Sequence, residues 1–173
     1  MRLVIIGTEH DFQDFDEDLR KCIANVMESE HATLICEEYL KAMYCRPAPI
    51  SIAHQVADSK EIPWVQIDMT TEQRIAAGID AKLYNRMQVR YEADGTVVQR
   101  LRYAPKEDGI REEFWLDRIA EEQTEGTALM VCGSLHARKL SEKAKQRGHD
   151  TKLLFHPENP GSQFWVSITP ESF

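Results

Sequence analysis

The chain has 173 residues, of which 42% are hydrophobic and 29% charged, and its formal net charge is −8. This composition is typical of a single globular domain, so we expect one domain over residues 1–173. The acidic balance argues against binding to nucleic acid or to an anionic membrane surface, because both repel a negatively charged protein. The N-terminal segment has no signal-peptide pattern and no stretch is apolar enough to span a bilayer, which favours a cytoplasmic protein.

Short apolar runs alternate along the chain with stretches whose apolar residues recur every three or four positions. The apolar runs predict buried strands over residues 2–6, 32–36, 63–68, 127–132 and 151–155. The amphipathic stretches predict helices over residues 15–29, 51–59, 70–78, 109–122 (or from 108) and 134–147. This alternation is typical of an α/β fold with a mostly parallel central sheet flanked by helices.

The middle of the chain departs from this alternation. Asp94-Gly95 stands between two strand-like runs, which is the sequence sign of a β-hairpin with a type I′ turn. Such a turn would pair Tyr91 with Val98. We therefore expect residues 84–104 to form a hairpin excursion from the main sheet.

The same four-residue pattern follows two of the predicted strands. GTEH, residues 7–10, ends the first strand, and GSLH, residues 133–136, ends the fourth. The glycine of each motif is expected to let the chain turn sharply at the strand end. Because the carboxyl ends of parallel strands meet at one edge of a sheet, where ligands usually bind, we expect His10 and His136 at the same rim.

Acidic residues follow the same strand ends. Glu37 directly follows the second strand, so we expect it to face the site, while its neighbour Glu38 is solvated or contacts the substrate. Asp68, after the third strand, either caps the next helix or joins the site. Glu9 either contacts the substrate or faces the positive end of the next helix. Two imidazoles and several carboxylates at one edge can bind a divalent metal such as zinc or manganese, or act as general acid and base.

Two arginines lie on the helix predicted after the hairpin. Arg111 is expected at the start of this helix and Arg118 two turns further along roughly the same face. A guanidinium there could bind a carboxylate or phosphate of the substrate by two parallel hydrogen bonds. The alternative for each arginine is a surface ion pair with a nearby glutamate, which contributes little.

The four cysteines show no CxxC pair and no metal-type spacing. We expect a reduced protein without a disulfide framework. Cys36, beside Glu37, is a minor candidate for a nucleophile with His10 as its base, although a thiol inside a strand is more often inert packing.

These motifs resemble those of the superfamily that includes TraB, TIKI, erythromycin esterase and ChaN proteins. Members share the paired GxxH, an acidic residue after the second strand, here Glu37 or Glu38, and an arginine between the two halves, here Arg111. REEFWLDRI followed by ALMVCGSLH is also similar to a compact bacterial branch of this group. The resemblance covers residues 1–155 through short motifs, and it implies a site built from both histidines, the glutamate and the arginine.

The activities that this resemblance implies are varied. TIKI-like members are metal-dependent proteases, erythromycin esterases cleave a lactone with a histidine as general base, and ChaN-like members bind haem. The resemblance therefore implies a site at the carboxyl edge of the sheet without implying one substrate.

We predict a hydrolase that cleaves an ester, amide or related bond of a small molecule or peptide. His10 is expected to be the general base or a metal ligand, and Glu37 to orient it or to complete the metal site. His136 is then a second ligand or the acid for the leaving group, and Arg111 holds an anionic group of the substrate or the developing oxyanion.

Two alternatives come from other classes of protein. One is a binding or sensing module without chemistry, for a small ligand or haem. The other is a structural partner protein, since the hairpin edge and the last predicted strand, residues 163–168 (QFWVSI), could supply an apolar face or a homodimer contact.

Overall fold

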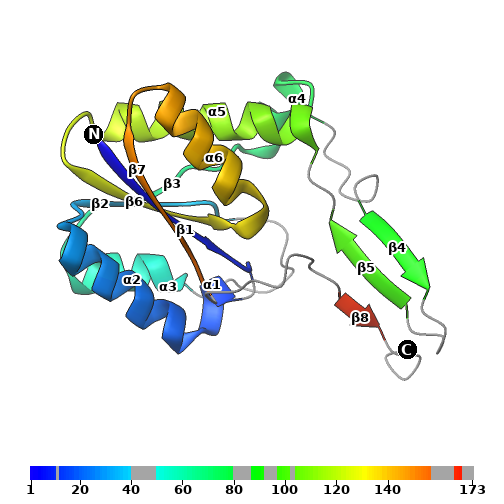
Figure 1. Cartoon of the computed structure of the whole chain (residues 1–173), viewed down its shortest axis with the longest axis horizontal. Coiled ribbons are helices and arrows are strands. Elements are labelled where there is room, and N and C mark those ends of the chain that lie inside the picture. Colours follow the sequence, from blue (N-terminus) through cyan, green and yellow to red (C-terminus); the bar gives the residue numbers. More distant parts are fainter. Residues whose placement is uncertain are drawn as a thin grey trace.

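A computed structural model describes residues 1–10, 12–39, 50–79, 87–91, 97–101, 104–156 and 166–168 of the chain. These residues form an α/β body and a small antiparallel sheet that lies to one side of it (Figure 1). The predicted α/β fold with a parallel central sheet is confirmed. No helix in the described ranges is long and apolar enough to cross a membrane.

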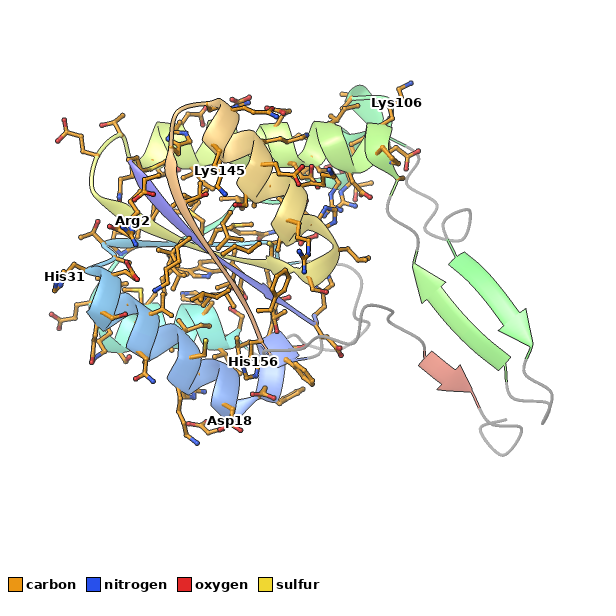
Figure 2. All side chains as sticks on the ribbon, viewed as in Figure 1. Arg2, Asp18, His31, Lys106, Lys145 and His156 are labelled. Carbon is orange, nitrogen blue, oxygen red and sulfur yellow. The ribbon has the colours of Figure 1, made fainter. Side chains whose placement is uncertain are left out.

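Five parallel strands form the central sheet, in the order β3-β2-β6-β1-β7. Their bounds are β1 (Arg2–Thr8), β2 (Leu34–Glu37), β3 (Trp64–Gln66), β6 (Thr127–Gly133) and β7 (Asp150–Phe155). The three inner strands, β2, β6 and β1, are buried on both faces, which explains why each is a continuous apolar run. In Figure 2, Arg2 and His31 lie near the amino edge of this sheet, and His156 lies at its carboxyl edge.

Helices cover both faces of the sheet (Figure 1). The helices are α1 (Phe12–Phe15), α2 (Glu17–Glu30), α3 (Ile52–Ser59), α4 (Thr71–Ala76), α5 (Pro105–Glu122) and α6 (Ser134–Gln146). Val4 and Ile6 of β1 pack in one hydrophobic core with α2 and α3. Leu3 and Ile5 point to the other face and pack in a second core with α5 and α6. Side chains that alternate along one strand therefore hold two opposite helix layers.

The chain leaves the neighbouring strands β1 and β6 towards opposite faces of the sheet. After β1 it enters α1 and α2 on one face, and after β6 it enters α6 on the other. In open α/β sheets, ligands bind outside the carboxyl ends of strands at such a topological switch point. Both GxxH motifs lie at this point, because they end β1 and β6.

Helix α5 begins earlier than the sequence pattern predicts. Its first residue is Pro105 rather than residue 108 or 109, because proline suits the first helical position, where no N–H is needed. The carboxylate of Asp108 accepts a hydrogen bond from the backbone N–H of Ala104 and closes this end of the helix. Arg111 consequently lies in the second turn of α5, not at its start.

The small sheet contains the predicted hairpin, with a different register. Its strands are β4 (Met87–Tyr91), β5 (Val97–Leu101) and β8 (Val166–Ile168), in the order β4-β5-β8. Tyr91 pairs with Val97 rather than Val98, so the predicted register is wrong by one residue. The predicted turn at Asp94-Gly95 lies outside the described residues. The last strand pairs with the hairpin edge, while the homodimer stays a prediction.

The first GxxH glycine, Gly7, lies where α6 crosses close to β1. A Cβ atom at this position would lie 2.7 Å from the Cβ of Ala137 and 2.9 Å from the ring of Phe155. Neither Gly7 nor Gly133 has a positive φ. These two glycines are therefore required for close approach, not for the sharp turn that the sequence suggested.

We expect Gly7→Ala to lower the free energy of unfolding by about 1–3 kcal/mol, because the added methyl group overpacks a rigid contact. Urea unfolding of both proteins measures the difference. The matched control is Gly109→Ala, where a Cβ would meet only the flexible end of Lys143 and alanine favours the helix. Equal stability of Gly7→Ala and wild type would contradict this interpretation.

Candidate functional site

Both GxxH histidines converge on one carboxylate, that of Glu38. His10 Nε2 lies 3.9 Å from Glu38 Oε1, and His136 Nε2 lies 3.8 Å from the same oxygen. His10 comes from the loop after β1, Glu38 from the end of β2, and His136 from the first turn of α6. A Cβ on Gly133, between them, would lie 3.0 Å from His10 Nε2 and 3.4 Å from Glu38 Oε2. Because Gly133 has no side chain, His10 and Glu38 can both lie close to the end of β6.

The guanidinium of Arg111 lies beneath this cluster and is 5% exposed. Its Nη2 donates to Glu38 Oε1 at 2.5 Å and to both carboxylate oxygens of Asp68 at 3.1 Å. The indole N–H of Trp115, one helical turn along α5, donates to the same Asp68 carboxylate. The expected role of Arg111 as a clamp for a substrate anion therefore does not fit, because the protein's own carboxylates occupy its donors.

His136 is held in one tautomer by contacts at both ring nitrogens. Its Nδ1 lies 3.1 Å from Glu112 Oε1, and its Nε2 lies 3.2 Å from Nη1 of Arg111. Because the carboxylate can only accept and the guanidinium can only donate, Nδ1 carries the proton and Nε2 accepts. With these contacts, Nε2 of His136 faces the donor Arg111, so the geometry favours His136 as a partner of Arg111 rather than as an acid for the leaving group.

Glu38 is a buried carboxylate that stays ionised. Burial raises its pKa, but the positive charges of His136, Arg111 and His10, the two histidines counting when their rings are protonated, outweigh burial and hold the pKa well below its usual range. The backbone N–H of Gly133 also donates to Glu38 Oε2 at 2.9 Å, at the positive end of α6. Glu38 therefore accepts hydrogen bonds at neutral pH and is too weak a base to take a proton.

Glu37 points away from the histidines, contrary to the expectation that it faces them. Its carboxylate accepts hydrogen bonds from Ser51 Oγ at 2.5 Å, Trp64 Nε1 at 2.9 Å and Gln13 Nε2 at 3.0 Å. Successive side chains at the end of a strand point to opposite sides, so only one of the two glutamates can reach the histidines. That residue is Glu38.

Gln13, which sequence reasoning missed, joins Glu37 to His10. Its Oε1 lies 2.7 Å from His10 Nδ1, and its Nε2 donates to Glu37 Oε1 and to the backbone carbonyl of Glu38. An amide oxygen can only accept, so the proton of neutral His10 is on Nδ1. The lone pair of Nε2 then faces Glu38, on a side chain that is 30% exposed. The available sequence signal was a glutamine three residues after the histidine.

The remaining predicted residues lie in less reactive positions. Arg118 is on the surface and pairs with Glu121 and Glu122, as the surface ion-pair alternative predicts. Asp68 accepts hydrogen bonds from arginine and tryptophan side chains inside the protein, so it supports the site rather than the substrate. Glu9 lies in the loop of His10, and its backbone carbonyl accepts from the N–H of Phe12.

The thiol of Cys36 is buried on the α5 side of the sheet. Burial raises its pKa to about 12. A thiol that stays protonated is a poor nucleophile, so the minor nucleophile hypothesis is not supported.

The described side chains do not fit the predicted zinc or manganese site. Within the described ranges, no group of three or more His, Cys, Asp or Glu residues is arranged to hold a metal ion. The guanidinium of Arg111 donates hydrogen bonds to Glu38, Asp68 and His136. The lone pairs that would coordinate a metal ion are therefore already used, and the positive charge of Arg111 would repel the ion.

Comparisons with family models, with curated proteins and with solved structures give no match for this chain.

The Arg111 network gives a stability prediction. We expect Arg111→Met to lower the free energy of unfolding by about 3–5 kcal/mol, because Glu38 would be left buried without its guanidinium partner and Asp68 would keep only its ion pair with Arg74. Chemical denaturation at neutral pH measures the loss. The control, Arg118→Met, removes only exposed ion pairs and is expected to change stability by less than about 1 kcal/mol. Similar losses in both variants would contradict a central role for Arg111.

Glu37 gives a pH-dependent prediction. Burial raises its pKa from 4.5 to about 7, so the folded protein holds this proton more tightly than the unfolded chain does. The resulting stabilisation is complete below pH 4.5 and is lost as the pH rises through about 7. Between pH 5 and pH 8, we expect wild type to lose about 2–3 kcal/mol of unfolding free energy relative to Glu37→Gln. Urea unfolding at both pH values checks this, and an unchanged difference would contradict it.

Proposed function

We propose that the protein is a hydrolase of an ester, amide or related bond, with His10 as the general base for an attacking water. The observation that carries the proposal is the proximity of two acceptor atoms, His10 Nε2 and Glu38 Oε1, 3.9 Å apart at the switch point of the sheet. The Nε2 lone pair is available because Nδ1 donates its proton to Gln13. A partly exposed imidazole at this edge has the chemistry that a general base needs.

The spacing of the two acceptors suits one water molecule. A water that donates one hydrogen to His10 Nε2 and the other to Glu38 Oε1 would lie about 2.8 Å from each atom. Its oxygen lone pairs would then face outward, towards a bound carbonyl group. The pKa of Glu38 is held low by its charged neighbours, so Glu38 orients the water while His10 takes its proton.

The reaction follows from these positions. The water oxygen forms a bond to the carbonyl carbon as His10 Nε2 accepts the proton, giving a tetrahedral intermediate. The bond to the leaving alcohol or amine then breaks, and the leaving group takes the proton from His10. Arg111 and His136 act at a distance, since they hold Glu38 ionised and in place. The products are a carboxylic acid and an alcohol or amine.

The resemblance to the TraB, TIKI, erythromycin esterase and ChaN superfamily supports this proposal in one respect. Of the activities it implies, hydrolysis by a histidine base is the one that matches a partly exposed imidazole with a defined tautomer. The metal-dependent activity is less well matched, because Arg111 lies among the required donors. We therefore propose an activity of the histidine-base type.

The test is hydrolysis of a panel of p-nitrophenyl esters and p-nitroanilides by the purified, chelator-treated protein. We expect turnover in wild type and a loss of about 10²–10⁴-fold in kcat/KM for His10→Ala, because general-base catalysis contributes about that much. The control is His149→Ala, a partly buried histidine that precedes β7 at the opposite edge of the sheet.

Equal activity of His10→Ala and wild type would overturn the assignment of His10 as base. The alternative, a binding module without chemistry, predicts no turnover with any substrate of the panel. In that case a ligand found by screening would bind to wild type and fail to bind to His10→Ala.

A further inference from the structure

We propose that Gln13 and Glu37 are positioning residues that set the tautomer of His10 and so keep its Nε2 free of a proton. Neither residue contacts a reacting atom in the proposed reaction. The effect on rate rests on the proposed function, whereas the effect on the tautomer is a property of the free protein. The inference follows from which atom must donate and which must accept in each hydrogen bond that links Glu37, Gln13 and His10.

Above pH 7, where Glu37 is ionised, the amide of Gln13 can take only one orientation. Its Nε2 lies 3.0 Å from Glu37 Oε1 and 3.1 Å from the backbone carbonyl of Glu38, and both atoms are acceptors. Turning the amide over would place its own oxygen against two oxygens. Gln13 is also buried, so water is not at hand to replace a lost partner. Its Oε1 therefore faces His10, and the proton must lie on Nδ1.

The orientation of Gln13 in turn depends on the carboxylate of Glu37. Ser51, the N-cap of α3, and Trp64 of β3 both donate to Glu37 Oε2. Glu37 Oε1 is then the atom that receives the amide of Gln13. Ser51 and Trp64 thus orient the carboxylate of Glu37. Through Glu37 and Gln13, they determine which nitrogen of His10 carries the proton.

Glu37→Gln should reverse this arrangement. The new amide oxygen would stay with the donors Ser51 and Trp64, which turns its NH₂ group towards the NH₂ group of Gln13. Two donors cannot pair, so Gln13 would turn its amide over and lose its bond to the Glu38 carbonyl. Its NH₂ would then donate to His10 Nδ1, and the proton of neutral His10 would move to Nε2.

Exchanging the two residues should restore the wild-type tautomer. In the double variant Gln13→Glu/Glu37→Gln, the amide at position 37 donates to the carboxylate at position 13, and that carboxylate accepts from His10 Nδ1. The amide oxygen still accepts from Ser51 and Trp64. This variant keeps the direction of every bond except the one to the Glu38 carbonyl.

The experiment is nitrogen NMR of ¹⁵N-histidine-labelled protein at pH 8, without substrate, which distinguishes protonated from unprotonated ring nitrogens. The protein has six histidines, and His10→Ala assigns the signals of His10. We expect a proton on Nδ1 in wild type, a proton on Nε2 in Glu37→Gln, a mixture in Gln13→Ala and a proton on Nδ1 again in the double variant. The control, Gln55→Ala, removes a glutamine of α3 that bonds Arg20 and Ile50, and it should match wild type.

A proton on Nε2 in wild type would overturn the inference, and so would an unchanged tautomer in both Glu37→Gln and Gln13→Ala. Kinetics separate this failure from that of the proposed function. We expect kcat/KM of Glu37→Gln to fall about 10²-fold and to recover in the double variant. If the tautomer changes but no variant hydrolyses any ester or amide, the inference holds and the hydrolase proposal fails. If His10 is needed for turnover while Glu37→Gln keeps both tautomer and rate, the hydrolase proposal holds and the inference fails.

Discussion

The site depends on a single buried guanidinium, that of Arg111. The carboxyl edge of the sheet brings Glu38 and Asp68 together inside the protein, where two unpaired negative charges would be strongly unfavourable. Arg111 donates to both carboxylates and also to His136. Because it lies on α5, which follows strands β4 and β5 in the chain, this contact joins the second half of the protein to the first. The site is complete only when both halves are folded.

The two GxxH histidines share a sequence pattern and differ in their chemistry. The strand β6 runs directly into α6, so His136 lies in a buried helical turn with both nitrogens bonded inside the protein. After β1, a short loop precedes α1, and His10 is left partly exposed with one nitrogen bonded to Gln13. The length of the connection after each strand thus decides which histidine stays partly exposed. In the proposed reaction, His136 supports Arg111 and His10 acts as the base.

Much of the architecture could be predicted from the sequence, because buried parallel strands are continuous apolar runs and surface helices are amphipathic. The rule that ligands bind at the carboxyl edge also predicted that the two GxxH histidines lie at the same rim. The choice between Glu37 and Glu38 could not be made, because it depends on where the strand ends to within one residue. A shift of one residue reverses the direction of a side chain.

Other features depended on tertiary contacts that the local pattern does not contain. The role of Gln13 depends on its contacts with Glu37 and Glu38 at the end of β2, which the sequence around Gln13 does not indicate. Arg111 and Arg118 look equivalent on a helical wheel, but only Arg111 faces the buried carboxylates, whereas Arg118 pairs with glutamates on its own helix. The predicted hairpin register was wrong by one residue, because Asp94-Gly95 indicates a turn but does not fix how many residues separate the paired strands.

The central claim is that Arg111 holds Glu38 as a charged carboxylate between the two histidines. The most direct measurement is a carbon NMR titration of the Glu38 carboxyl signal, assigned with Glu38→Gln, between pH 3 and pH 8. The account predicts that this carboxyl stays ionised below pH 4.5, the usual pKa of a glutamate, because its charged neighbours outweigh the effect of burial. Protonation of Glu38 near or above neutral pH would contradict the account, since a neutral Glu38 could neither pair with Arg111 nor orient a water towards His10.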